Sequence, residues 1–75
     1  MRVEIFVRPD GNDWEVDDTC AGFRQSHPTS AAALRQAREI ARLTWLERRR
    51  ASAVKVLGPG GWKIDSFYGL EGRLG

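Results

Sequence analysis

The stretch from Thr29 to Gly69 constrains the fold more than any other part of the chain. It begins with an alanine-rich segment in which Ala33, Ala37 and Ala41 recur at helical spacing on one face. Two segments of strand-like composition follow, separated by the turn Gly58-Pro59-Gly60-Gly61. Because alanine side chains are small, we expect the backbone of this helix to lie close to a sheet formed in part by the two strands.

The beginning of the helix is marked by its local sequence. His27 precedes Pro28, and a residue before proline avoids the helical region. Thr29 then has the hydroxyl that caps a first turn. The sequence predicts a helix from about Ser30 to about Arg49. Ile40 and Thr44 share the alanine face and Leu34 lies at its edge, whereas Leu43 and Leu46 lie off it and Trp45 lies on its border.

The N-terminal part predicts a hairpin and a short third strand. Val3, Ile5 and Val7 alternate with polar or aromatic residues, which is typical of a half-buried strand. Turn residues fill positions 9–13, and a second alternation begins at Trp14. Residues 22–26 predict a short third strand. Two further strands are predicted over 52–57 and 62–68, so that the element order is β-β-(β)-α-β-β. This order predicts a small α+β domain, with an antiparallel sheet of four to five strands and one amphipathic helix on one face.

Length and composition limit the classes of protein to consider. Seventy-five residues suffice for one domain, which we place over residues 1–69, with a flexible tail over 70–75. A hydrophobic fraction of 41% is typical of a globular chain. No apolar stretch is long enough for a membrane span, and the N-terminus lacks the apolar segment of a signal peptide. We therefore expect a cytoplasmic protein without a membrane partner.

Short motifs follow one another in a distinctive order along most of the chain. An Asp-Gly…Trp hairpin precedes a Thr-capped helix with an Ala-Arg-x-x-Ala core, and a Gly…Ile…Tyr-Gly hairpin ends the series. The residues concerned are Asp10, Gly11 and Trp14, then Thr29, Ala33, Ala37, Arg38 and Ala41, then Gly61, Ile64, Tyr68 and Gly69. Over residues 3–69 this order resembles DUF2188, a family of small uncharacterised bacterial domains. The resemblance implies a fold and no activity.

The sequence offers little for catalysis or for metal binding. Cys20 and His27 are the only soft nucleophile and base, and no third group is placed to orient the base. One cysteine and one histidine cannot form a structural zinc site within the chain. The acidic run over residues 10–15 fails the calcium-loop pattern, because Trp14 and Glu15 occupy its fifth and sixth positions. We therefore expect no enzyme, no cofactor and no metal.

Positive charge is concentrated on the helix. Residues 27–55 carry seven basic side chains against two acidic ones, whereas residues 1–26 carry six acids against three bases. Four arginines fall on one side of the helix, opposite the alanine face: Arg35, Arg38, Arg42 and Arg49. Such a stripe either is an ordinary solvated helix face or binds nucleic acid weakly through phosphates.

Large apolar side chains outside the predicted core favour self-association. Phe6 and Phe67 are expected on the outer face of the sheet, near Glu4, Glu15, Asp17 and Asp65, and Leu43 and Leu46 lie on the helix off its core face. A small domain without disulfides gains stability by pairing. Our first hypothesis is a non-catalytic interaction module that forms a homodimer or binds another protein. The alternative is sequence-independent nucleic-acid binding through the arginine stripe.

Overall fold

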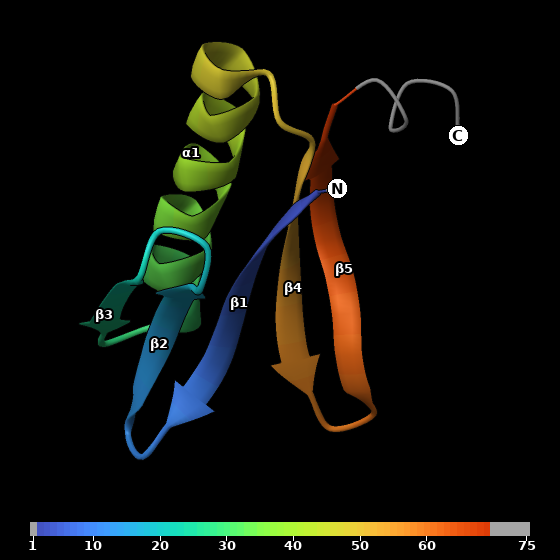
Figure 1. The fold of residues 1–75 in the computed structure, drawn as a ribbon. Coiled ribbons are helices and arrows are strands. Elements are labelled where there is room, and N and C mark those ends of the chain that lie inside the picture. Colours follow the sequence, from blue (N-terminus) through green and yellow to red (C-terminus); the bar gives the residue numbers. More distant parts are fainter. Residues whose placement is uncertain (1, 70–75) are drawn as a thin grey trace.

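The computed structural model describes residues 2–69, in which five strands and one helix follow one another along the chain (Figure 1). The elements are β1 (Val3–Asp10), β2 (Asp13–Asp18), β3 (Phe23–His27), α1 (Ser30–Arg48), β4 (Ser52–Gly58) and β5 (Gly61–Tyr68). The predicted α+β domain with one helix is confirmed, and the short third strand is present. The flexible tail predicted for residues 70–75 lies outside the described residues.

The five strands form one mixed sheet in the order β3-β2-β1-β4-β5. Three neighbouring pairs are antiparallel, but the central pair of β1 and β4 is parallel, so the prediction of a wholly antiparallel sheet is wrong at this pair. The reason lies in the connection. Because β1, β2 and β3 alternate in direction, β3 runs the same way as β1, and the 19-residue α1 then carries the chain back along the sheet. β4 therefore starts at the same end as β1, as expected of a helical crossover.

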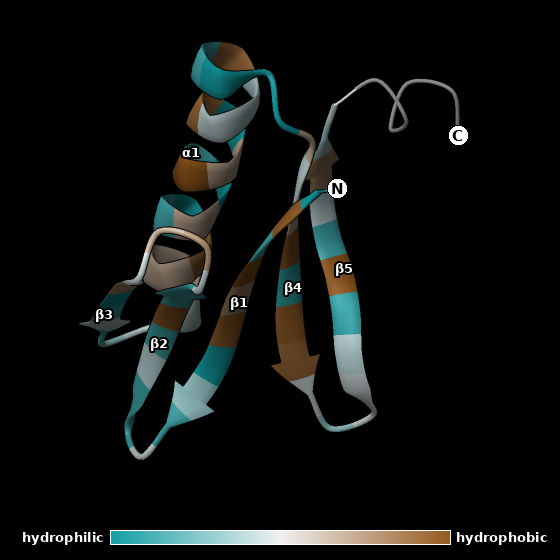
Figure 2. Ribbon diagram, in the orientation of Figure 1, coloured by the Kyte–Doolittle hydropathy of each residue, from teal (hydrophilic) through white to brown (hydrophobic). Residues whose placement is uncertain are grey.

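The core lies between the sheet and one face of α1. Val3, Ile5 and Val7 of β1 are buried together with Val16 and Val54. In Figure 2 the apolar residues of the two central strands, β1 and β4, appear in brown. Ala33, Ala37 and Ala41 are fully buried against this sheet face, which confirms the predicted core face of the helix. The approach is close enough for the Ser52 hydroxyl to donate to the Ala41 carbonyl at 2.6 Å.

Both ends of α1 have defined caps. Thr29 is extended, and its Oγ1 accepts a hydrogen bond from the Ala32 amide at 3.1 Å, as predicted. At the other end Arg49 adopts a left-handed conformation with φ 57° and ψ 34°, and its amide donates to the Trp45 carbonyl at 2.9 Å. This conformation ends the helix one residue before the predicted boundary.

A bulge in β5 changes the direction of Asp65. Ser66 pairs with Val54 and Ile64 pairs with Lys55, so Asp65 is the additional residue between the two pairs. Its carboxylate accepts two hydrogen bonds of 2.8 Å from Arg38 of α1. Asp65 therefore faces the helix, and the expectation that it lies near the outer aromatic residues is wrong.

Candidate interaction surface

The sheet has one face covered by α1 and one face that no other element of residues 2–69 covers, which we call the open face (Figure 1). Alternation along each strand decides which side chains lie there. Because Val3, Ile5 and Val7 point into the core, Glu4, Phe6 and Arg8 lie on the open face. The registers of the neighbouring strands extend this face from Arg24 of β3 to Trp62 of β5.

One half of the open face is an apolar patch. Its members come from β1, β4 and β5 and are Phe6, Leu57, Trp62, Ile64 and Phe67. The rings of Phe6 and Trp62 meet edge to face, with centroids 5.2 Å apart and planes at 73°. Trp62 is 45% exposed and Ile64 is 55% exposed. Large apolar side chains gathered at this exposure are typical of a contact surface.

Charged side chains lie beside and within the patch: Arg2 and Glu4 lie near the start of β1, and Lys55 pairs with Phe6 on one side and Ile64 on the other. The Arg2 guanidinium lies 5.6 Å from the centroid of the Phe67 ring. Glu4 accepts from Lys55 Nζ at 2.7 Å and from Arg2 Nη2 at 3.4 Å. The hydrogen bond from Lys55 is the main cause that lowers the pKa of Glu4. Glu4 is thus held between two cations, of which Lys55 lies among the apolar side chains of the patch.

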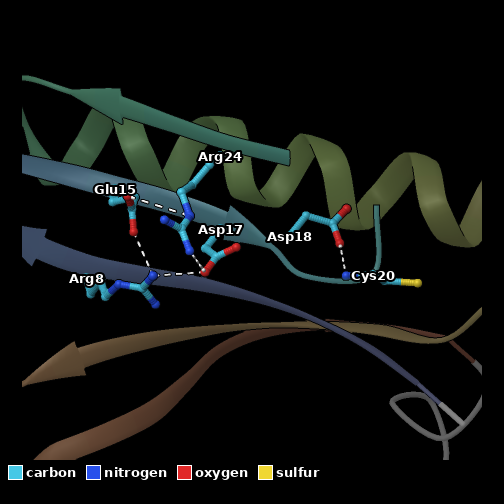
Figure 3. Close-up of polar contacts among 6 residues, drawn as sticks. All are labelled: Arg8, Glu15, Asp17, Asp18, Cys20 and Arg24. Carbon is cyan, nitrogen blue, oxygen red and sulfur yellow. Dashed lines mark hydrogen bonds and ion pairs between the residues drawn. The ribbon is translucent and has the colours of Figure 1, made fainter. Parts of the chain in front are cut away.

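The other half of the open face carries four charged residues, which we call the ionic quartet: Arg8, Glu15, Asp17 and Arg24 (Figure 3). Arg8 Nη2 donates to Glu15 Oε1 at 2.6 Å and to Asp17 Oδ2 at 2.8 Å. Arg24 lies 3.9 Å from Glu15 and 3.8 Å from Asp17. The hydrogen bond with Asp17, followed by the charge of Glu15, raises the pKa of Arg8. The quartet has two charges of each sign and therefore no net charge.

The structure gives two of the four stripe arginines a partner within the chain. Arg38 binds Asp65, and Arg42 donates to both carboxylate oxygens of Glu39 at 3.0 Å and 2.7 Å. Arg35, Arg38 and Arg42 line a groove of about 610 Å³ that also includes Tyr68. Arg49 lies apart from this groove, with its guanidinium 5.7 Å from the Trp45 ring centroid. The four arginines thus do not form one continuous free surface.

The residues expected to mediate self-association fall on two different surfaces. Phe6 and Phe67 lie on the open face, as predicted from their alternation. Leu43 and Leu46 lie on α1, where Leu43 lines a groove and Leu46 is 47% exposed. Leu57, Trp62 and Ile64 lie on the open face as well, although they were not among the residues expected to mediate self-association. Alternation places Trp62 and Ile64 on the same face of β5. The bulge at Asp65 then shifts the alternation by one residue, so that Phe67 lies on this face too.

The two candidates for catalysis are not brought together. Cys20 is exposed in the loop before β3, and His27 lies at the far end of that strand. His27 Nε2 is hydrogen-bonded to Gln36 Oε1, whose amide in turn donates to Gln25. Within residues 2–69, no three His, Cys, Asp or Glu side chains are placed to hold one metal ion.

Within residues 2–69, α1 is the one helix, and it is too polar to cross a membrane.

Comparison with known proteins yields no matching family model, curated protein or solved structure. The resemblance to DUF2188 therefore stays a prediction.

Proposed function

We propose that the protein is a non-catalytic interaction module that binds a second copy of itself through the open face. The observation that carries the proposal is the apolar patch around the Phe6–Trp62 ring pair, which α1 leaves uncovered. Two such patches facing each other would exclude water from aromatic rings on both sides. A surface that pairs with its own copy also fits the two-fold symmetry of most small homo-oligomers.

The charges of the open face support a second copy as the partner. The ionic quartet carries no net charge, so two copies of it do not repel each other strongly. Glu4 offsets one of the two positive charges of Arg2 and Lys55, so this second cluster keeps a net charge of only +1. Because Arg8 and Arg24 are already paired with Glu15 and Asp17, a phosphate backbone would gain little attraction from the quartet, which favours a protein partner on this face.

The size of the face is sufficient for a dimer of ordinary dimensions. Five strands about 4.8 Å apart, rising about 3.3 Å per residue, present a face of roughly 500 Å² in projection. A standard interface buries about 800 Å² of accessible surface per partner. Because protruding side chains give the face more accessible surface than its projected area, a dimer would use nearly the whole open face.

Sedimentation velocity over a wide range of protein concentration tests the proposal. We expect the wild type to change from monomer to dimer and Trp62→Glu to remain monomeric, since a carboxylate would be buried against the partner's patch. Leu46→Glu is the matched control: Leu46 is exposed to nearly the same fraction, 47% against 45% for Trp62, but lies on α1. It should dimerise like the wild type.

Two results would contradict the proposed interface. A wild type that sediments as a monomer at every concentration would remove the dimer. Dissociation by Leu46→Glu and not by Trp62→Glu would move the interface from the open face to the helix. Circular dichroism on both variants ensures that loss of mass is not loss of fold.

The nucleic-acid alternative receives less support. Arg38 and Arg42 already bind Asp65 and Glu39 in bidentate pairs, and breaking these pairs would offset part of any gain from phosphate contacts. A fluorescence anisotropy titration with duplex DNA at low salt is the direct check. Salt-sensitive binding that Arg38→Glu with Arg42→Glu abolishes would favour the stripe over the open face.

A further inference from the structure

A groove on the helix side of the sheet contains a buried carboxylate that none of the basic side chains of residues 2–69 pairs with. The groove lies between α1 and the loop after β2 and has a volume of about 320 Å³. Asp18 lines it together with the apolar side chains of Phe23, Ile40 and Leu43. Apolar walls with a small number of polar groups are the usual composition of a small-ligand site.

Asp18 is only partly satisfied by its surroundings. It is 5% exposed, and its Oδ1 accepts hydrogen bonds from the amides of Cys20 at 3.1 Å and Ala21 at 3.2 Å. Figure 3 shows Oδ1 turned toward the Cys20 amide and the second oxygen pointing away from it. A carboxylate has about four acceptor positions, so Oδ2 keeps its full capacity.

Asp18 Oδ2 has no hydrogen-bond partner among residues 2–69, and it is not sealed from solvent, so a ligand can reach it. Buried carboxylates are almost always paired with a positive charge or several donors. Among residues 2–69, no lysine or arginine lies within ion-pair distance of Asp18, although Arg48 lines the same groove. Since Oδ1 is already occupied by two amides, a guanidinium could not bind in its bidentate manner, whereas an ammonium needs a single oxygen.

We infer that this groove binds a primary ammonium group carried on an apolar chain, with Asp18 Oδ2 accepting from the ammonium and Phe23, Ile40 and Leu43 covering the methylene groups. The site lies on the opposite side of the sheet from the open face. It is therefore independent of the proposed dimer, and either proposal can fail without the other.

The test is an amide chemical-shift titration at constant ionic strength with n-butylammonium, and with n-butyrate and n-butanol as matched probes. We expect saturable shifts at Cys20 and Ala21, whose amides report on Asp18, with n-butylammonium only. Asp18→Asn keeps the acceptor for both amides and removes the charge, and it should weaken binding by at least about tenfold. Glu47→Gln, at the same groove, should change the affinity by less than about twofold.

Equal affinity in Asp18→Asn, or equal shifts with n-butanol, would overturn the ammonium site. Arg48→Gln keeps the inference falsifiable if Asp18→Asn fails to fold. Removing this neighbouring cation should leave ammonium binding as tight as in wild type or tighter, and a loss of binding would contradict the inference.

A parallel titration with acetyl-lysine methylamide distinguishes the two sources of such a group. Tighter binding of this probe would assign the ammonium to a lysine side chain, and tighter binding of n-butylammonium would assign it to a free amine.

Discussion

At the scale of single residues, the three alanines of α1 decide how near the helix lies to the sheet. Ala37 is the central one and is fully buried. We expect Ala37→Leu to lower the free energy of unfolding by about 1–3 kcal/mol, because a larger side chain at this contact forces the helix away from the strands. Urea denaturation measures the change. Ala31→Leu is the control, since Ala31 is exposed on the same helix, and equal stability of the two variants would mean that the helix is not packed closely.

The ion pair between Asp65 and Arg38 predicts a pH dependence of stability. Hydrogen bonds from Arg38 are the main cause that lowers the pKa of Asp65 below 3.8 in the fold. Since the charged carboxylate is the form that the fold favours, its contribution is fully present above the unfolded value of 3.8 and is lost as the pH falls through the folded pKa. Wild type should therefore be more stable than Asp65→Asn at neutral pH, and the difference should vanish well below pH 3.8.

Denaturant unfolding at several pH values checks this dependence. Asp10→Asn is the matched control, since it removes the same charge from the exposed end of β1, where no ion pair is formed within residues 2–69. A stability difference for Asp65→Asn that persists unchanged into acid would show that the residue acts through the shape of the bulge and not through its charge.

At the scale of elements, the cap residue that follows α1 has an unfavourable backbone conformation. Arg49 has a left-handed φ of 57°, a conformation that suits glycine better than any residue with a Cβ. We expect Arg49→Gly to raise the free energy of unfolding by up to about 1 kcal/mol, the gain being reduced by loss of the contact with Trp45. Arg48→Gly, one residue earlier and inside the helix, should lower it by about 1 kcal/mol. Thermal unfolding of both variants gives the comparison, and a destabilised Arg49→Gly would mean that the Trp45 contact outweighs the strain.

The elements themselves could be predicted because their signals are local. Thr29 after proline marks the helix start, and the spacing of Ala33, Ala37 and Ala41 marks its core face. The parallel pairing of β1 with β4 has no such local signal, since it depends on how α1 returns the chain to the sheet. The bulge at Asp65 likewise depends on which residues of β4 lie opposite.

The candidate surfaces were predictable to the same extent. The position of Phe6 on the open face follows from alternation within one strand. The contact of Phe6 with Trp62 joins strands that are more than fifty residues apart in the chain, and the sequence has no pattern for it. The Asp18 groove is also an assembly of distant parts, because a loop after β2 meets the last turns of α1 there.

At the scale of the whole molecule, the two faces of the sheet have different roles in stability. α1 covers one face and forms the core with it, whereas Trp62 and Ile64 on the open face are about half exposed. A domain of 75 residues has little stability to spare. Burial of the open face against a second copy would therefore add a substantial fraction to the free energy of folding.

This coupling predicts that the melting temperature depends on protein concentration. Where the dimer prevails, each tenfold increase in concentration should stabilise a protomer by about 0.7 kcal/mol, half of the about 1.4 kcal/mol for a tenfold change in an equilibrium. A change of about 1 kcal/mol shifts the melting temperature of a domain of this size by about 4–8 °C, so we expect a rise of several degrees in differential scanning calorimetry. Trp62→Glu should melt at one temperature throughout, and Leu46→Glu should follow the wild type. A wild-type melting temperature that does not change with concentration would mean that the fold is complete as a monomer and that the apolar patch contributes nothing to it.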